Sequence, residues 1–259
     1  MHIRVIEISK QYNFIKMERR IKLINNSELE IKNNAVNHKN NSLNRLDLSF
    51  LKHIELKEYK QSDLLAYWIN DFSEYHDEEK TFDTTKMKTF KRGDIIKVNL
   101  GYNIGNELGG LHYCVVINKF DNPFNGTLNV IPVTSKKENK RYHKSCVSLG
   151  SELYNILSTN IERENNKLNN LLNELDKLDN IPEDFSKAIL KQMRYLEKLG
   201  NEINKLKIDS IALITQITTI SKQRIYDDII LRKVRLSANS LNVIDKKINY
   251  YFTNQKEPI

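Results

Sequence analysis

Side chains suited to phosphate chemistry gather around two expected strands near the middle of the chain. The segment RGDIIKVNLGYNIGNELGGLHYCVVIN places Glu107, a glycine pair and His112 directly before an apolar stretch. The next expected strand ends in VIPVTSKK, where hydroxyl and ammonium groups follow one another: Thr134, Ser135, Lys136 and Lys137. If neighbouring strands bring these ends together, the set suits phosphodiester cleavage, with a base for the nucleophile and cations for the developing charge.

Spacing alone leaves other interpretations of these residues open. A single histidine before a strand is more often structural than catalytic. Tyr113 is a candidate for stacking on unpaired bases or for packing at the edge of the core. Arg224 is a candidate for a phosphate contact or for an ion pair with Asp227 or Asp228. The sequence contains no glycine-rich phosphate loop and no Cys/His metal cluster, so neither a metal nor another cofactor is expected.

The positive charge of the chain is concentrated in two segments. The 259 residues carry a formal charge of +8. Residues 91–150 hold 9 basic and 4 acidic side chains, and residues 208–259 hold 8 and 5, whereas the rest is close to neutral. This distribution indicates one basic unit, formed by 91–154 and 208–259, that is interrupted by an insertion at 155–207. A basic unit favours acidic partners such as nucleic acid.

The hydrophobic pattern predicts an α+β fold. Short strands with tight turns over residues 91–154 are typical of a small β-barrel or sandwich. Pro132 is expected to place its strand at an edge or a bulge. Leucines at three- and four-residue steps on both sides of Pro182 predict an antiparallel helical hairpin over 155–207. Ser237 is expected to cap a final helix.

Residues 1–90 form an N-terminal extension. The Asn-rich run 25–44 is expected to be a poorly ordered connector. A helix is expected near residues 62–80, with Trp68 on its apolar face. Two cysteines in the chain give no disulfide framework, and no window approaches a membrane span or a leader, so a cytoplasmic protein is expected.

Four motifs in order resemble the MazF/PemK toxins of bacterial toxin–antitoxin systems. These are Arg92-Gly93-Asp94, then GNELGGLHYCVV at 105–116, then IPVTS at 131–135, and finally SIALITQITTI at 210–220, which contains Gln216 and is followed by Arg224. Together they span 91–150 and 208–252, on both sides of the expected insertion. The match therefore agrees with the charge distribution.

The resemblance implies an SH3-like β-barrel with a C-terminal helix, in a protein that is usually a homodimer. Members of this family are metal-independent endoribonucleases that cut single-stranded RNA by 2′-hydroxyl attack until a cognate antitoxin blocks the groove. By this resemblance, the catalytic Arg and Thr of the family correspond to His112 and Thr134. A loop Glu that is important for function in the family corresponds to Glu107. The remaining residues expected to bind RNA are Arg92, Tyr113, Ser135, Lys136, Lys137, Gln216 and Arg224.

The sequence departs from the family pattern at His112, where Arg is usual. Imidazole titrates near neutral pH and guanidinium does not, so we expect His112 to act as an acid or base while Lys136, Lys137 or Arg92 supplies fixed charge. Thr215 and Thr218 also replace residues that are commonly charged. The alternatives are a non-cleaving nucleic-acid-binding protein or gyrase poison on the same barrel, and an interaction protein in which the extension and hairpin act.

Overall fold

The computed structural model describes residues 17, 28–177, 180–226 and 234–253. The chain divides into two compact units, Met1–Ala66 and Tyr67–Ile259, which we describe separately. Some residues used in the sequence predictions lie outside the described part of the chain: Leu178, the last leucine of the repeat before Pro182, and Asp227 and Asp228, the expected partners of Arg224.

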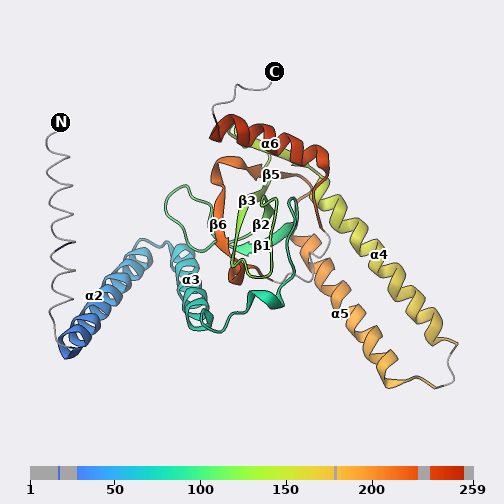
Figure 1. Cartoon of the computed structure of the whole chain (residues 1–259), viewed down its shortest axis with the longest axis horizontal. Helices are drawn as coiled ribbons and strands as arrows, with labels where there is room; N and C mark the ends of the chain where they lie inside the picture. Colours follow the sequence, from blue (N-terminus) through green and yellow to red (C-terminus); the bar gives the residue numbers. More distant parts are fainter. Residues whose placement is uncertain (1–16, 18–27, 178–179, 227–233, 254–259) are drawn as a thin grey trace. The chain divides into compact units, whose positions relative to one another are not determined.

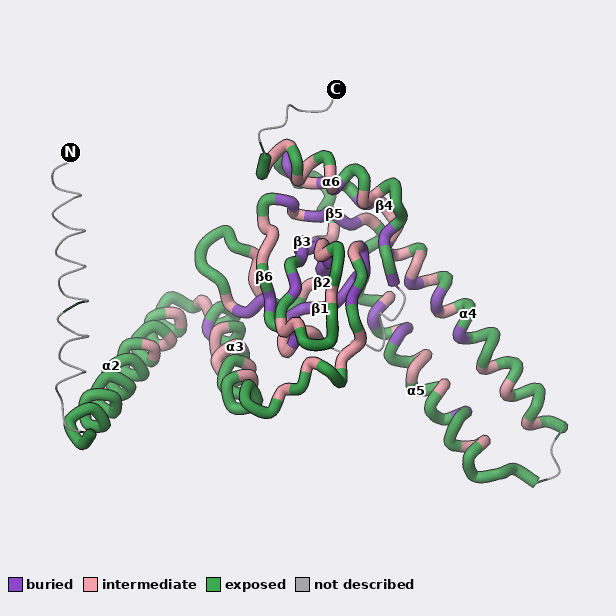
Figure 2. The backbone as a smooth tube through the Cα atoms, viewed as in Figure 1, coloured by how far each residue is buried: buried purple, intermediate pink, exposed green. Residues whose placement is uncertain are grey.

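In the described part of the first unit, the main element is one long helix. Helix α2 covers Glu28–Glu55 and buries none of its residues, as Figure 2 also shows. Residues 28–44, expected to form a poorly ordered connector, therefore lie in a helix instead. Its first turn carries Glu28 and Glu30 and its last turn Lys52 and His53, which suits the helix dipole and offsets the low helix propensity of its asparagines.

The second unit is built on a six-stranded antiparallel sheet, so the fold is of the expected α+β class (Figure 1). Strands β1 to β3 follow one another in space, and β5 lies between β3 and β4. The second half of the chain thus completes a sheet that the first half begins. The strands are β1 (Ile95–Asn99), β2 (Leu111–Val116), β3 (Thr127–Ser135), β4 (Cys146–Gly150), β5 (Ser210–Leu213) and β6 (Thr218–Ser221).

Strand β3 is central, and it has two different neighbours along one side. Its first half pairs with β6 and its last three residues pair with β5. The 3₁₀ turn η2 (Ile214–Gln216) separates β5 from β6. Pro132 lies between the two paired stretches, where the missing N–H breaks no ladder bond on that side. The edge or bulge expected at Pro132 is therefore a gap between two partner strands.

The sheet curves until its ends meet. After β6 and the 3₁₀ turn η3 (Lys222–Arg224), Ile225 forms a β-bridge with Val98 on the outer side of β1. The path from β1 through β2, β3 and β6 thus returns to β1. Its interior holds a buried cluster of apolar residues: Phe90, Ile96, Val98, Leu100, Cys114, Val116, Leu128, Val130 and Ile220. Burial also raises the pKa of the Cys114 thiol, which is typical of a structural rather than a reactive cysteine.

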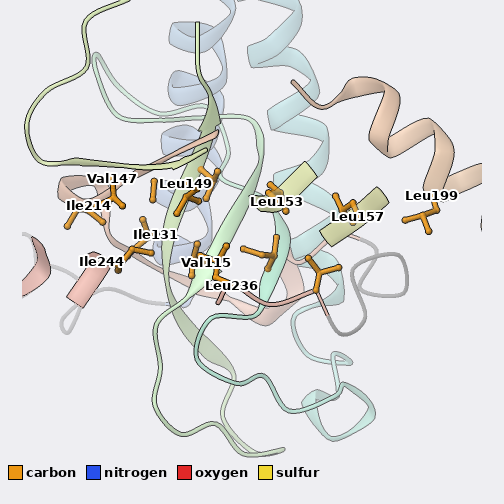
Figure 3. Packing of buried hydrophobic residues seen from close by; sticks show 14 residues of the cluster. Val115, Ile131, Val147, Leu149, Leu153, Leu157, Leu199, Ile214, Leu236 and Ile244 are labelled. Carbon is orange, nitrogen blue, oxygen red and sulfur yellow. The ribbon is translucent and has the colours of Figure 1, made fainter. Parts of the chain in front are cut away.

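Helices cover the other face of the sheet. Two of them, α4 (Glu152–Leu175) and α5 (Glu183–Lys205), pack against each other along their length in opposite directions (Figure 1). Their bases join a second core with α6 (Ala238–Phe252), and Figure 3 shows Leu157, Leu199 and Ile244 in it. The side chain of Ser237 accepts a hydrogen bond from Ser240 N, so the predicted N-cap of α6 is confirmed. No helix in the described part of the chain is both long and apolar enough to cross a membrane.

A polar cluster ties α5 to the sheet. Glu202 Oε2 accepts hydrogen bonds from Lys97 Nζ at 2.7 Å and from the Tyr113 hydroxyl at 2.6 Å. Lys97 and Glu202 are only 14% and 11% exposed. Burial by itself would raise the pKa of Glu202, but Lys97 and Tyr113 outweigh it and lower that pKa. The carboxylate is therefore ionised at neutral pH and holds two groups that would otherwise be buried without a partner.

We predict that Glu202→Ala lowers the free energy of unfolding by about 2–3 kcal/mol at neutral pH, because Lys97 loses its counter-charge. Urea titration measures this value. The matched control is Glu183→Ala, which removes the 82%-exposed partner of Lys187 and should cost less than about 0.5 kcal/mol. Since the folded pKa of Glu202 lies below its unfolded value, its contribution is lost as the pH falls through the folded pKa. Equal losses in the two variants would contradict the prediction.

Candidate functional site

The register of the sheet brings His112 and Thr134 together. Tyr113 on β2 faces Val133 on β3, so the next residues outward are His112 and Thr134. Each lies two residues along its strand from Cys114 or Pro132, and alternate residues of a strand share one face of the sheet. His112 and Thr134 therefore lie on the face that encloses the interior core. Residue Thr134 is half-buried and pairs with Ile211 of β5 on its other side. The sequence prediction that these two strand positions meet agrees with this register.

His112 is held by backbone groups of two segments. Its Nδ1 lies 3.3 Å from the carbonyl oxygen of Val133, and the ring also bonds to the backbone of Gly109. Burial lowers the pKa of His112, while these two hydrogen bonds act in the opposite direction. The imidazole is therefore neutral at physiological pH. If the ring takes up a proton, the backbone groups of Val133 and Gly109 stabilise the imidazolium that forms.

A cavity of about 540 Å³ lies where β5 and β6 separate. Its walls come from the β1–β2 loop (residues 100–110) and from the segment 215–224, and Pro132 borders it from the sheet. Three residues expected from the sequence line it: Glu107, Gln216 and Arg224. The apolar surfaces come mainly from leucine and isoleucine and the polar ones from amide and hydroxyl groups: Leu100, Leu108, Ile217, Ile220, Asn103, Asn106, Thr215 and Thr218.

Gln216 fastens the β1–β2 loop over this cavity. Its Oε1 accepts a hydrogen bond from Leu108 N at 2.8 Å, and its Nε2 donates to Asn106 O at 2.9 Å. The base of the loop closes at Gly109, where an added Cβ would lie 2.6 Å from the carbonyl oxygen of Gly101. Glycine is needed there because the two arms of the loop approach so closely. The exposed Glu107 thus sits on a loop fixed at both its middle and its base.

Arg224 reaches the cavity from a support that includes the N-terminal helix α3 (Tyr59–Glu78). Its Nε donates to the carbonyl oxygen of Asn99 at 2.8 Å, and its guanidinium lies 5.3 Å from the ring centroid of Trp68. The same ring covers Gly101, where a Cβ would approach it to 2.8 Å. Burial lowers the pKa of Arg224, but a guanidinium remains charged in proteins. Arg224 therefore places a fixed cation on the wall of the cavity.

Helix α3 is tied to the strands beside Arg224 by further hydrogen bonds. Asn99 Nδ2 donates to Asp71 at 2.7 Å and to the Tyr75 hydroxyl at 3.3 Å. Gln223 Nε2 donates to the carbonyl oxygen of Tyr75 at 2.8 Å. The sequence places Trp68 on the apolar face of the helix expected near residues 62–80, which predicts a core position but not its contact with Arg224. Sequence gives no signal for it, because the two residues are more than 150 positions apart.

Two expected RNA-binding residues lie away from this cavity. Tyr113 points to the opposite face of the sheet, where its hydroxyl bonds to Glu202, and hydrogen bonding and burial raise its pKa strongly. Arg92 lies at the far end of β2, where it bonds to the carbonyl oxygen of Ile117 and to Asp245 of α6. Neither side chain is placed to contact a ligand of the cavity. RNA binding by Arg92 and Tyr113 stays a prediction, and the structure places both side chains outside the cavity.

The other expected residues continue β3 beyond Thr134. Ser135 ends the strand, and its carbonyl oxygen accepts a hydrogen bond from the Tyr142 hydroxyl. Lys136 and Lys137 follow it and are exposed, although Lys136 Nζ lies 3.6 Å from Asp209. They border the His112–Thr134 positions without lining the cavity. The described residues include no group of three or more His, Cys, Asp or Glu side chains that could hold a metal.

Comparison with known families identifies the segment that contains His112, Thr134 and half of the residues lining the cavity. Residues 91–198 match the model of a family described as the PemK-like, MazF-like toxin of type II toxin–antitoxin systems. The match covers β1 to β4, all of α4 and most of α5, and it ends before β5. A search of curated proteins found no match. Residues 91–198, less than half of the chain, are therefore similar to the PemK-like, MazF-like family of toxins from type II toxin–antitoxin systems.

Proposed function

We propose that this protein is the toxin of a toxin–antitoxin pair and that it cleaves single-stranded RNA without a metal. The observation that carries this proposal is the family match, because the matched segment contains the β1–β2 loop, His112 and Thr134. The closed path of β1, β2, β3 and β6 supports the SH3-like barrel of this family as the fold. The cavity beside Glu107 and Arg224 supports a binding site on that barrel.

The chemistry that this site supports is attack by a ribose 2′-hydroxyl on the adjacent phosphorus. The 2′-oxygen–phosphorus bond forms while the bond to the 5′-oxygen breaks, which leaves a 2′,3′-cyclic phosphate. His112, neutral at physiological pH, accepts the 2′ proton, and the leaving 5′-oxygen takes a proton from water. Thr134 donates a hydrogen bond to a phosphate oxygen. Arg224 is the fixed cation, a role that we give to it because Arg92 is engaged at the other end of β2.

The partners follow from the same proposal. We infer that single-stranded RNA enters along the cavity and that a cognate antitoxin covers it, since the family consists of type II toxins. The basic segments 91–150 and 208–259 favour an antitoxin with an acidic binding segment. A homodimer and a cytoplasmic site of action remain parts of the proposal.

A second function is favoured by the surroundings of His112. Both of its ring contacts are to backbone groups, and an Arg common to the family is absent at this position. A protein that only binds nucleic acid fits these contacts as well.

Expression in growing bacteria separates the two functions. The proposed toxin should stop growth and fragment cellular RNA within minutes, and co-expression of the acidic partner should restore growth. Growth arrest with intact RNA would favour the binding protein, and gyrase-dependent DNA breaks would favour a gyrase poison.

A further inference from the structure

The loop between β2 and β3 presents two aromatic side chains to solvent. Phe120 is 81% exposed and Phe124 is 85% exposed. Their rings contribute nothing to either buried cluster of the sheet. Aromatic side chains gain most of their stabilising effect from burial, so two exposed rings in one short loop call for a ligand that covers them.

This loop is fixed to the sheet by a buried ion pair. Asp121, between the two phenylalanines, lies 2.9 Å from Lys222 Nζ, and their side chains are 0% and 1% exposed. Asp121 also accepts a hydrogen bond from Phe90 N at 2.9 Å. The Lys222 ammonium donates in addition to the carbonyl oxygen of Asn122 at 3.2 Å. A buried ion pair is costly to form, and here each charge is matched and hydrogen-bonded.

The tip of the loop is fixed as well. Asn122 Oδ1 accepts a hydrogen bond from Phe124 N at 2.9 Å, which closes a turn. Thr84 Oγ1 donates to the carbonyl oxygen of Pro123 at 2.6 Å. The two rings are therefore presented by an ordered backbone. Pre-organisation of this kind lowers the entropic cost of binding.

We propose that Phe120 and Phe124 form a stacking platform for unpaired bases of the RNA. Lys119 lies next to them, with its Nζ 5.5 Å from the ring centroid of Phe120, and supplies a cation for the backbone. Aromatic rings combined with basic groups are the usual recognition surface for single strands. This inference rests on the proposed function for the identity of the ligand.

The position of the loop agrees with a single strand that also occupies the cavity. Thr218, at the start of β6, lines the cavity, and Ser221, at its end, pairs with Thr127 directly after the loop. The three residue steps from Thr218 to Ser221 span about 10 Å. An RNA of a few nucleotides that leaves the cavity along β6 therefore reaches the two rings.

A second copy of the chain fits this surface less well. Two phenylalanine side chains offer about 200 Å² each, whereas a stable interface buries about 800 Å² per partner. The neighbouring residues Lys119 and Asn122 are polar and exposed, and Pro123 adds only one small exposed ring to the apolar surface. Base stacking needs only the ring faces, so we commit to RNA as the ligand.

The test is the affinity of a fluorescent single-stranded 12-nucleotide RNA in which every 2′-hydroxyl is methylated, so that it cannot be cleaved. Fluorescence anisotropy should show at least about 30-fold weaker binding by Phe120→Ala/Phe124→Ala, from the loss of two stacking contacts. The double tryptophan variant should bind as tightly as the parent. Phe252→Ala, which removes a 54%-exposed ring of α6, is the matched control and should leave the affinity unchanged.

Unchanged affinity in the double alanine variant would overturn the platform. A lower mass of this variant in sedimentation, with its RNA affinity unchanged, would also overturn it, because that result indicates that the rings form an interface between copies. If the parent cleaves unmodified RNA and the double alanine variant binds the methylated RNA as tightly as the parent, only the platform fails. If the parent binds this RNA through the rings but cleaves none, only the proposed cleavage fails. A parent that binds no single-stranded RNA overturns both.

Discussion

Replacement of His112 by alanine should lower the rate of RNA cleavage at least about 100-fold, since a positioned general base contributes on the order of 10²–10⁴. The imidazole lies opposite Thr134 in the β2–β3 register and is held by the backbone of Val133 and Gly109. Its removal leaves the 2′-hydroxyl without a proton acceptor. Initial rates on a short RNA measure the effect. The thermal midpoint of the variant controls for loss of fold, and a rate equal to that of the parent would contradict the assignment.

The pH dependence gives a sharper form of the same test. Burial lowers the pKa of His112, so the acid limb of the rate profile should have its midpoint below about 6.5, the ordinary value for histidine. His112→Arg restores the residue common in the family and replaces a titrating group with a permanent cation. Because a guanidinium cannot accept the 2′ proton, we expect this variant to cleave RNA more slowly than the parent and to lose that acid limb. An unchanged limb in His112→Arg would show that another group titrates.

Replacement of Arg224 by alanine should lower cleavage by on the order of 10²–10³, because the cavity loses its fixed cation. Arg224→Lys should recover little of this loss, because an ammonium group cannot reproduce both the guanidinium contact over the Trp68 ring and the Nε hydrogen bond to Asn99 O. The control is Arg194→Ala, which removes an exposed arginine of α5.

Trp68 separates electrostatic from structural effects at this position. Trp68→Phe keeps a ring under the guanidinium and over Gly101, and should retain most of the activity. If Arg224→Ala and Arg194→Ala cleave RNA at the same rate, Arg224 has no role in the reaction. The contact also gives α3 a place beside the site, which the sequence did not indicate.

The parts of the fold that depend on local pattern could be predicted from the sequence. Alternation at Ile96 and Val98, the apolar run at Cys114 and the cap at Ser237 each reflect neighbours within a few residues. The basic charge on both sides of 155–207 indicated a unit with an insertion, and β5 does lie between β3 and β4. The prediction of a poorly ordered connector at the Asn-rich run was wrong over residues 28–44, which lie in α2. It rested on amino-acid composition, and composition carries no information on whether a segment continues a helix that extends to Glu55.

The parts of the site that depend on distant contacts could not be predicted. Pro132 looked like an edge residue, but its missing N–H coincides with the gap between β5 and β6, which is also where the cavity opens. Arg92 and Tyr113 have the right types and spacing for RNA contacts. Asp245 and Glu202, more than 80 residues away, engage them instead. Residue type gives a candidate role, and only the partner across the fold decides it.

The most direct test of the central claim is the 3′ end of RNA treated with the purified full chain in the presence of EDTA. The account predicts fragments that end in a 2′,3′-cyclic phosphate, identified by mass spectrometry, from the parent, and intact RNA from a His112→Ala/Arg224→Ala variant under the same conditions. RNA that stays intact with the parent, or fragments that end in a 3′-hydroxyl, would contradict the claim.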